Sequence, residues 1–414
     1  MMTSRERLKK ALAHQPVDRI PIDFSGHRSS GIAALAYPGL RRYLGLSPKP
    51  LRVYDLVQQL AIVDDDVLDV FQVDTIEMGR GFCTEDSDWQ EWTLPDGTPC
   101  WIPSYLNLEK RGEDWVVLSD EGRILGMQKK GCLYFEQTYY PLQKRNIAEE
   151  DFSDLEKILP QTIWTGVPHP GAHLDMDDEG LKKISHGARS LRESTSRGII
   201  GLFGGNMFEI PQMLYRMDGY LLSLGLYPEA VLRLSEKLFV IHMKNLEKWL
   251  EAVGPYIDVI QFGDDLGGQR GPLISPEMYR RFYKPFHRRL WNRAKELADV
   301  TVMLHCCGGV RELLGDFIDA GLEAINPVQL SARGMEAKGL KRDFGRDLVF
   351  WGGGCDTHEV LPHAAPDEVR RHVREQIKKF RPGGGYVFQQ VHNILANVPP
   401  ENIAAMFEAA GTPF

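Results

Sequence analysis

The second half of the chain alternates short apolar segments with long amphipathic ones, and this pattern constrains the fold more than any other feature. Each apolar segment is followed by Gly or polar residues and then by a helical pattern, as in Pro366–Phe380. We interpret six such segments as strands: Ile199–Phe203, Val259–Phe262, Val300–Leu304, Ala324–Ile325, Leu348–Trp351 and Tyr386–Phe388. With further strands expected near Ile20 and Thr75, the total is about eight, which predicts an α/β protein with a (β/α)8 TIM barrel.

An open doubly wound sheet is the alternative architecture for such an alternation. We find no Gly-x-Gly-x-x-Gly motif after a predicted strand, and the turns Gly352–Gly354 and Gly383–Gly385 lack the spacing of that motif. A dinucleotide site is therefore not expected.

Residues 83–145 have a different sequence pattern, in which Trp and Tyr alternate with polar residues. Asp96-Gly97 and Glu121-Gly122 stand at turn positions within this stretch. The pattern predicts a β-hairpin insertion within a single barrel domain that spans residues 1–414. The insertion could line a substrate pocket, dock a partner, or form an ordinary packed lid.

Charge and hydropathy restrict the classes of partner. The chain has 49 Lys and Arg against 57 Asp and Glu, a net charge of -8, which argues against nucleic-acid binding. No apolar run approaches the roughly 20 residues of a membrane span, and residues 1–7 are polar, unlike a signal peptide. We therefore expect a cytoplasmic protein with a small-molecule substrate and no membrane partner, for which a homodimer is a possible assembly.

Six cysteines in 414 residues favour thiols or metal ligands over a disulfide scaffold.

Chemically reactive side chains follow several predicted strands. In a parallel barrel the residues just after the strands converge on one mouth, where active sites lie. The strand Val300–Leu304 is followed by His305 and Cys307, and the strand Leu348–Trp351 by Cys355. The last strand is followed by His392, and the strand ending at Phe262 by Asp264 and Asp265. The sequence thus predicts imidazole, thiol and carboxylate groups at one mouth.

His305 and Cys307 lie two residues apart, so in extended chain they point to the same side. Imidazole and thiolate suit Zn²⁺, and a catalytic zinc needs about three protein ligands and one open position. We therefore predict a Zn²⁺ site built from His305, Cys307, Cys355 and His392, four candidates for three places. The alternative is that each is an ordinary buried thiol or hydrogen-bonded imidazole.

Other polar residues at the mouth are candidates for contact with substrate. Asp264 and Asp265 could orient substrate or hydrogen-bond a metal-bound imidazole, or one of them could merely cap a loop. Gln329 follows another strand, and Arg28 follows the first one, where it could bind a carboxylate or a phosphate. We assign catalytic roles to Asp265 and His392, and substrate contacts to Arg28, Asp264 and Gln329.

Three stretches resemble the uroporphyrinogen decarboxylase superfamily: residues 5–21, the run from Gly263 to Pro276, and the C-terminal part from His305 to Ile403. The resemblance covers most of the chain and implies a distorted (β/α)8 barrel. It also implies one of two chemistries, namely cofactor-free decarboxylation of a tetrapyrrole, or zinc-dependent methyl transfer to or from a corrinoid protein.

Departures from the decarboxylase pattern favour the second chemistry. The decarboxylases carry Arg-Gln-Ala-Gly-Arg after the first strand, where this chain has Phe24–Arg28. Their pyrrole-binding aspartate falls near Gly81 and their active-site tyrosine near Gln212, while the histidine of their last strand matches His392.

The methyltransferase branch resembles this chain in His305-x-Cys307, although its usual third ligand is a cysteine in the last strand, where this chain has His392. The resemblance implies zinc as cofactor and a corrinoid (cobalamin) carried by a partner protein. It also implies a small methylated substrate, for which a methoxyaryl compound is one candidate. The alternatives are uroporphyrinogen decarboxylation and a barrel that binds a ligand without turning it over.

Overall fold

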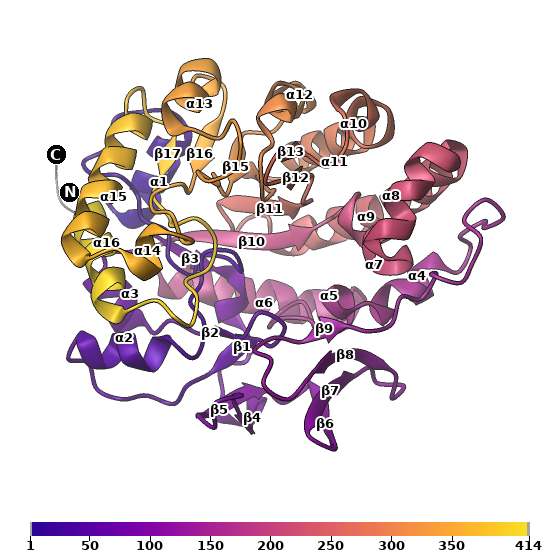
Figure 1. Cartoon of the computed structure of the whole chain (residues 1–414), viewed down its shortest axis with the longest axis horizontal. Helices are drawn as coiled ribbons and strands as arrows, with labels where there is room; N and C mark the ends of the chain where they lie inside the picture. The colour runs from indigo at the N-terminus through magenta and orange to yellow at the C-terminus, as the bar shows by residue number, and fades with distance from the viewer. Residues whose placement is uncertain (1, 412–414) are drawn as a thin grey trace.

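A curled parallel sheet forms the centre of the molecule, as the computed structural model of residues 2–411 shows (Figure 1). Every neighbouring pair of its seven strands is parallel. In sheet order these are β17 (Tyr386–Val387), β16 (Val349–Trp351), β15 (Ala324–Asn326), β14 (Thr301–His305), β11 (Val259–Gly263), β10 (Gly198–Gly204) and β3 (Thr75–Glu77). The six strands predicted beyond residue 198 are all present, within one or two residues of the expected bounds.

The two edges of this sheet are joined by the segment around Ile22. The Ile22 carbonyl accepts the Asp74 N–H on one side, and on the other side the Asp23 N–H donates to the Phe388 carbonyl while the Phe388 N–H donates to the Pro21 carbonyl. This segment thus stands in the place of the predicted first strand, but it forms an isolated bridge because Pro21 has no N–H to donate. The prediction of a distorted (β/α)8 barrel is confirmed.

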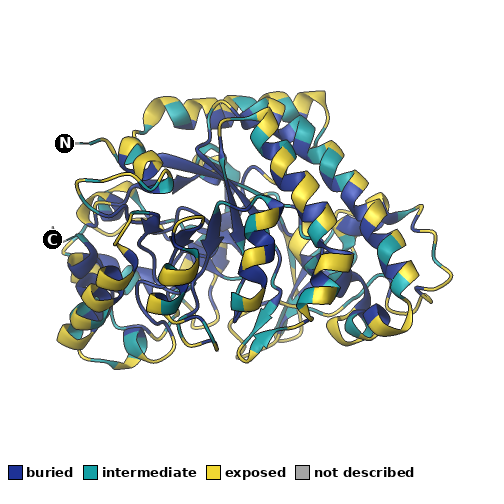
Figure 2. Ribbon diagram, turned by 90° about the horizontal axis from the view of Figure 1, so that it is seen from above, coloured by how far each residue is buried: buried dark blue, intermediate teal, exposed yellow. Residues whose placement is uncertain are grey.

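Helices cover the outside of the sheet and turn their apolar faces inward (Figure 2). The longer ones are α1 (Ser4–Leu12), α6 (Asp178–Ser194), α8 (Met217–Leu226), α9 (Pro228–Val253), α11 (Lys284–Leu297), α13 (Ala337–Phe344), α15 (Pro366–Phe380) and α16 (Pro400–Gly411). Shorter ones are α2 (Tyr37–Tyr43), α3 (Asp65–Val70), α4 (Leu155–Ile158), α5 (Ile163–Gly166), α7 (Glu209–Tyr215), α10 (Pro276–Phe282), α12 (Leu314–Ala320) and α14 (Val360–His363). None of the helices between residues 2 and 411 combines the length and apolarity needed to cross a bilayer.

The barrel interior is filled at one end. A cluster of fully or almost fully buried side chains comes from six strands and from α1: Leu8, Ile200, Val259, Met303, Ala324, Val349, Trp351 and Val387. Helix α1 supplies Leu8 and contacts β3, β10 and β17. The interior at this level is therefore packed, and the predicted site residues such as His305 lie beyond it, at the carboxyl ends of the strands.

Six antiparallel strands lie between β3 and β10, all within residues 83–145 (Figure 1). β4 (Trp89–Thr93) pairs with β5 (Pro99–Pro103). β6 (Asn107–Arg111), β7 (Asp114–Leu118), β8 (Ile124–Gln128) and β9 (Glu136–Gln137) form a second sheet. Two pairs of short antiparallel strands complete the structure. These are β1 (Val53–Asp55) with β2 (Leu60–Ala61), and β12 (Gly267–Gly268) with β13 (Gly271–Pro272).

Candidate metal centre

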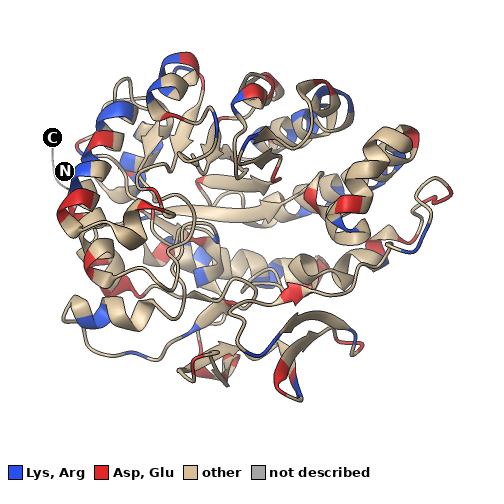
Figure 3. Ribbon diagram, viewed as in Figure 1, with Lys and Arg blue, Asp and Glu red and all other residues tan. Residues whose placement is uncertain are grey.

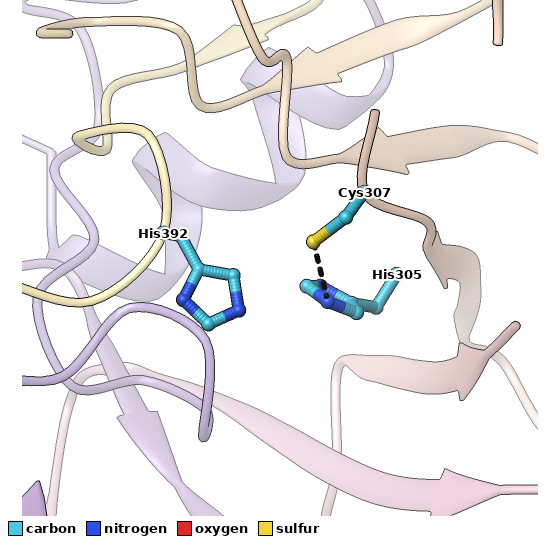
Figure 4. A group of neighbouring side chains, drawn as sticks. All are labelled: His305, Cys307 and His392. Carbon is cyan, nitrogen blue, oxygen red and sulfur yellow. Dashed lines mark hydrogen bonds between the residues drawn. The ribbon is translucent and has the colours of Figure 1, made fainter. Parts of the chain in front are cut away.

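Three side chains, from the middle strand of the sheet and from the loop after its edge strand β17, meet at the carboxyl ends of the strands (Figure 4). His305 is the last residue of β14, Cys307 lies two residues beyond it, and His392 follows β17 with a left-handed φ of 65°. One potential ligand atom from each lies within 4.8 Å of the others. The Cys307 Sγ lies 3.4 Å from the His305 Nε2. Tetrahedral zinc with ordinary bond lengths spaces sulfur and nitrogen ligands about 3.5 Å apart, so the spacing fits this metal.

A buried amide fixes the tautomer of His305. The Nδ2 of Asn326 donates to the Trp351 carbonyl at 3.1 Å and to Gln389 Oε1 at 2.6 Å. Its Oδ1 therefore faces His305 Nδ1, 2.9 Å away, and accepts the proton of that nitrogen. The lone pair of His305 is thus on Nε2, the atom that faces Cys307, as a metal ligand requires.

Replacing Asn326 by Ala is expected to lower zinc affinity by about 10- to 100-fold, because the His305 ring loses the acceptor that fixes its tautomer and orientation. A competition titration against a chelator measures the change. Asn402→Ala is the matched control, since Asn402 is equally buried but donates to the Leu361 and Ala364 carbonyls. An equal loss of affinity in both variants would contradict the role assigned to Asn326.

The ring nitrogens of the third residue, His392, have no hydrogen-bond partner among residues 2–411. The centre of its ring lies 5.4 Å from that of the His305 ring. Burial lowers the pKa of His392 to about 3, with His305 and His27 adding to the effect. Its imidazole is therefore neutral at pH 7 and available as a ligand.

Negative charge is also disfavoured here in the absence of a cation. Burial raises the pKa of the Cys307 thiol well above its ordinary value, and the Asp265 carboxylate raises it further. Asp265 Oδ1 accepts the Cys307 backbone N–H at 2.7 Å and lies 3.8 Å from His305 Nε2. Burial likewise lowers the pKa of His305. A divalent cation would stabilise the thiolate and the carboxylate together, so the donor set fits a metal.

These pKa shifts predict a specific pH dependence of metal binding. Burial lowers the pKa of both imidazoles below that of a free imidazole, so at pH 7 and above both are neutral and only Cys307 has to lose a proton when the metal binds. The logarithm of the zinc affinity is expected to rise by about one for each pH unit between pH 7 and 8. A slope that steepens toward three below pH 6, in chelator-buffered titrations, would mean that the imidazoles keep ordinary pKa values.

One of the four predicted ligands, Cys355, lies outside the group of three. The thiol of Cys355 is fully buried, with its closest recorded polar contact the Asp356 carbonyl at 3.8 Å. Burial raises its pKa far above the ordinary value. The neighbouring Cys306 is also fully buried, in the main apolar core. The structure therefore brings together His305, Cys307 and His392 and leaves Cys355 out.

Asp264 has a different environment from the substrate contact expected of it. Its carboxylate accepts the backbone N–H groups of residues 207–209 at 2.8 to 3.0 Å, at the start of α7. It also lies 2.9 Å from His287 Nε2, and it is fully buried. Protein groups occupy both of its oxygens, so Asp264 holds β11 against α7, as in the capping alternative, although the loop it caps is a different one. Asp265, with 37% of its side chain exposed, is the accessible member of the pair.

Gln329 and Arg28 also make contacts within the protein. Gln329 Oε1 accepts the Gly308 N–H at 2.9 Å and so braces the loop that carries Cys307. Arg28 Nε pairs with Asp55 Oδ2 at 2.6 Å, and its guanidinium lies 5.0 Å from the Trp164 ring centre. The Glu77 carboxyl is also close enough to interact with the Arg28 charge.

Two carboxyl groups near these residues, buried Glu77 and half-buried Glu209, escaped the sequence analysis. Glu77 ends β3, and burial raises its pKa to about 7. Its Oε1 lies 3.7 Å from His169 Nδ1, and the Tyr54 side chain interacts with the same carboxyl group. Glu209 begins α7, where burial, Asp265 and Asp264 raise its pKa well above the ordinary value. The strand-end rule could have found Glu77, whereas nothing local distinguishes Glu209.

Comparison with known proteins agrees with this fold. The family model for uroporphyrinogen decarboxylase (URO-D) matches residues 173–412, which is more than half of the chain. The chain therefore belongs to the uroporphyrinogen decarboxylase family.

Individual relatives carry two kinds of name. The uroporphyrinogen decarboxylase of Alkalilimnicola ehrlichii is 24% identical over 360 residues, 76% of this chain and 89% of that protein. The methylated-thiol--coenzyme M methyltransferase of Methanosarcina mazei is 28% identical over 141 residues, 33% of this chain and 34% of that protein. A solved methyltransferase from Methanosarcina mazei has the same fold, with a TM-score of 0.57, 15% identity, and coverage of 99% of this chain and 98% of that one.

Proposed function

We propose that this protein is a zinc-dependent methyltransferase that moves a methyl group between a small methylated substrate and a corrinoid carried by a partner protein. The observation that carries the proposal is the meeting of His305, Cys307 and His392 at the carboxyl ends of the strands. Three soft or borderline ligands leave the fourth tetrahedral position for a substrate, which is the arrangement of a catalytic zinc site. The relatives named as methyltransferases support the same reading.

The bound zinc would supply Lewis acidity that polarises a thiol or ether group of the substrate. The chain's own residues prepare that position. Asn326 holds His305 with Nε2 toward the metal position, and Gln329 braces the Cys307 loop through Gly308. Asp265 lies beside both ligands and is partly exposed, so it can hold the proton that a substrate thiol or hydroxyl loses or regains.

The first-strand region supports a small substrate with little charge. Arg28 is paired with Asp55, and Glu77 close to them has its pKa raised to about 7, so the positive charge here is already compensated. A substrate with many carboxylates would need several unpaired cations, because each buried unpaired carboxylate costs several kcal/mol. The Trp164 ring over Arg28 offers instead a flat apolar surface to a methoxyaryl group.

Uroporphyrinogen decarboxylation is the second candidate, because the relative matched over most of this chain carries that name. The environment of Gly81, the position that matches the pyrrole-binding aspartate of the decarboxylases, argues against this function. A Cβ added at Gly81 would lie 2.4 Å from the Gly187 carbonyl oxygen, so an aspartate does not fit there without movement of the backbone.

A paired assay tests the proposal. The zinc-loaded protein is incubated with uroporphyrinogen in one vessel, and with methoxyaryl or methylthiol compounds plus cob(I)alamin in the other. We expect methylcobalamin to form in the second vessel and no coproporphyrinogen in the first. Coproporphyrinogen formed at a catalytic rate, without methylcobalamin, would overturn the proposal in favour of the decarboxylase.

A further inference from the structure

Two adjoining hollows open at the end of the barrel opposite the metal centre. One has a volume of about 1080 Å³ and is lined by residues 14–17 and by α15, and the other has about 520 Å³ and is lined by α13 and the turn after it. Both are also lined by His14, Pro382 and Gly383. Since residues 382–384 lie just before β17, and the C-terminal end of α13 just before β16, these hollows lie at the amino ends of the strands.

The walls of these hollows are strongly basic. They carry ten Lys and Arg against two acidic residues, in a chain with a net charge of -8. The basic residues are Lys338, Lys341, Arg342, Arg346, Arg370, Arg371, Arg374, Lys378, Lys379 and Arg381, and the acidic ones are Asp367 and Glu375. Figure 3 shows Lys and Arg gathered on α13 and α15. The smaller hollow has five of these cations and no acidic residue.

Several of these cations are not neutralised within the chain. Lys338, Arg346, Arg374 and Lys378 have no ion-pair partner among residues 2–411. Lys341 donates to the Gly384 carbonyl, and burial lowers its pKa to about 8. Like charges held this close together repel one another unless an anion lies between them.

Besides the basic side chains, the hollows have an unobstructed backbone position at Gly383 and an apolar part of one wall. Gly383 has a φ of 77°, and nothing lies within 4 Å of the position that a Cβ would take there. An anion can therefore approach its backbone closely. Pro16, Val17 and Pro382 line the larger hollow beside its charged residues. An all-basic hollow next to a mixed one suits a molecule with a charged end and an uncharged end.

We propose that the two hollows bind one small organic polyphosphate, such as a nucleoside triphosphate. Its phosphates lie in the smaller hollow among Lys338, Lys341 and Arg346, and its uncharged part lies in the larger one against Pro16 and Val17. Hollows of about 1080 and 520 Å³ have the size that small ligands fill, which favours a small ligand over an extended acidic polypeptide. The site lies at the other end of the barrel from His305, so it is independent of the proposed methyl transfer.

Isothermal titration of the full chain tests this site, with adenosine triphosphate, tripolyphosphate and adenosine as probes in Mg²⁺-free buffer. We expect one triphosphate per chain, competition by tripolyphosphate, an affinity that falls with salt, and no binding of adenosine alone. In the double variant Lys338→Gln/Arg346→Gln the affinity is expected to fall at least about 10-fold, because two charge-assisted contacts are lost. Both residues are exposed, so the fold is retained.

Lys110→Gln/Lys129→Gln is the matched control, because it removes two exposed lysines of the hairpin insertion, one in β6 and one directly after β8. Its affinity is expected to equal that of the wild type. Three outcomes would overturn the proposal. These are no binding of either polyphosphate at millimolar concentration, an equal affinity in the Lys338→Gln/Arg346→Gln variant, and binding of poly-glutamate with no binding of polyphosphate.

Discussion

The variant Cys307→Ala is expected to bind zinc at least about 100-fold more weakly than the wild type, because it loses the one thiolate among the three ligands. The two remaining imidazoles cannot hold the metal against a competing chelator. The fold is expected to survive, since Cys307 is only partly buried and lies on a loop at the mouth. Zinc content after dialysis measures the first effect, and thermal unfolding of the metal-free proteins measures the second.

Cys355→Ala is the matched control for this experiment. It removes a more deeply buried thiol from the same end of the barrel, but one outside the group of three. It is expected to keep one zinc per chain and to lose some stability through the small cavity that it leaves. If Cys355→Ala loses the metal while Cys307→Ala retains it, the ligand set is wrong.

The second large effect concerns stability, and Asp264→Ala is expected to lower the free energy of unfolding by about 3 to 5 kcal/mol. The substitution leaves the backbone N–H groups of residues 207–209 without their acceptor, and the His287 Nε2 without its partner. All of these groups are in or next to the buried core, where an unsatisfied donor costs about 1 to 3 kcal/mol. Urea unfolding of the metal-free protein measures the change.

Asp218→Ala provides the comparison for Asp264→Ala. Asp218 lies in the first turn of α8, but it is exposed, and within residues 2–411 its recorded ion pair is with Arg216. Its replacement is expected to change the free energy of unfolding by less than about 0.5 kcal/mol. A loss below about 1 kcal/mol in Asp264→Ala would contradict the structural role given to that carboxylate.

The barrel could be predicted from the sequence because its strands are short, apolar and bounded by Gly or polar residues. Pro366–Phe380 is helical over the expected range, since Pro at its first position and the apolar spacing act together. The segment at Ile22 was harder to predict, because its strand pairing depends on two partners that lie 52 and 366 residues away. Local patterns carry no information about such pairings.

The candidate site could be predicted in part, because the strand-end rule selects residues by position and chemistry. It selected His305, Cys307 and His392, which the structure brings together, and it selected Cys355 equally, because spacing along the chain does not specify which side chains face the mouth. Asp264 and Asp265 are adjacent and chemically identical, yet one is fully buried by α7 and the other is partly exposed. Only tertiary packing distinguishes them.

The most direct test of the central claim is X-ray absorption spectroscopy at the zinc edge on the purified, zinc-loaded protein. We expect one zinc per chain with one sulfur ligand at about 2.3 Å and two imidazole nitrogens at about 2.0 to 2.1 Å, and a fourth, exchangeable light-atom ligand. Addition of a thiol substrate is expected to raise the sulfur count from one to two. A protein that takes up no zinc, or a spectrum with only oxygen ligands, would contradict the account.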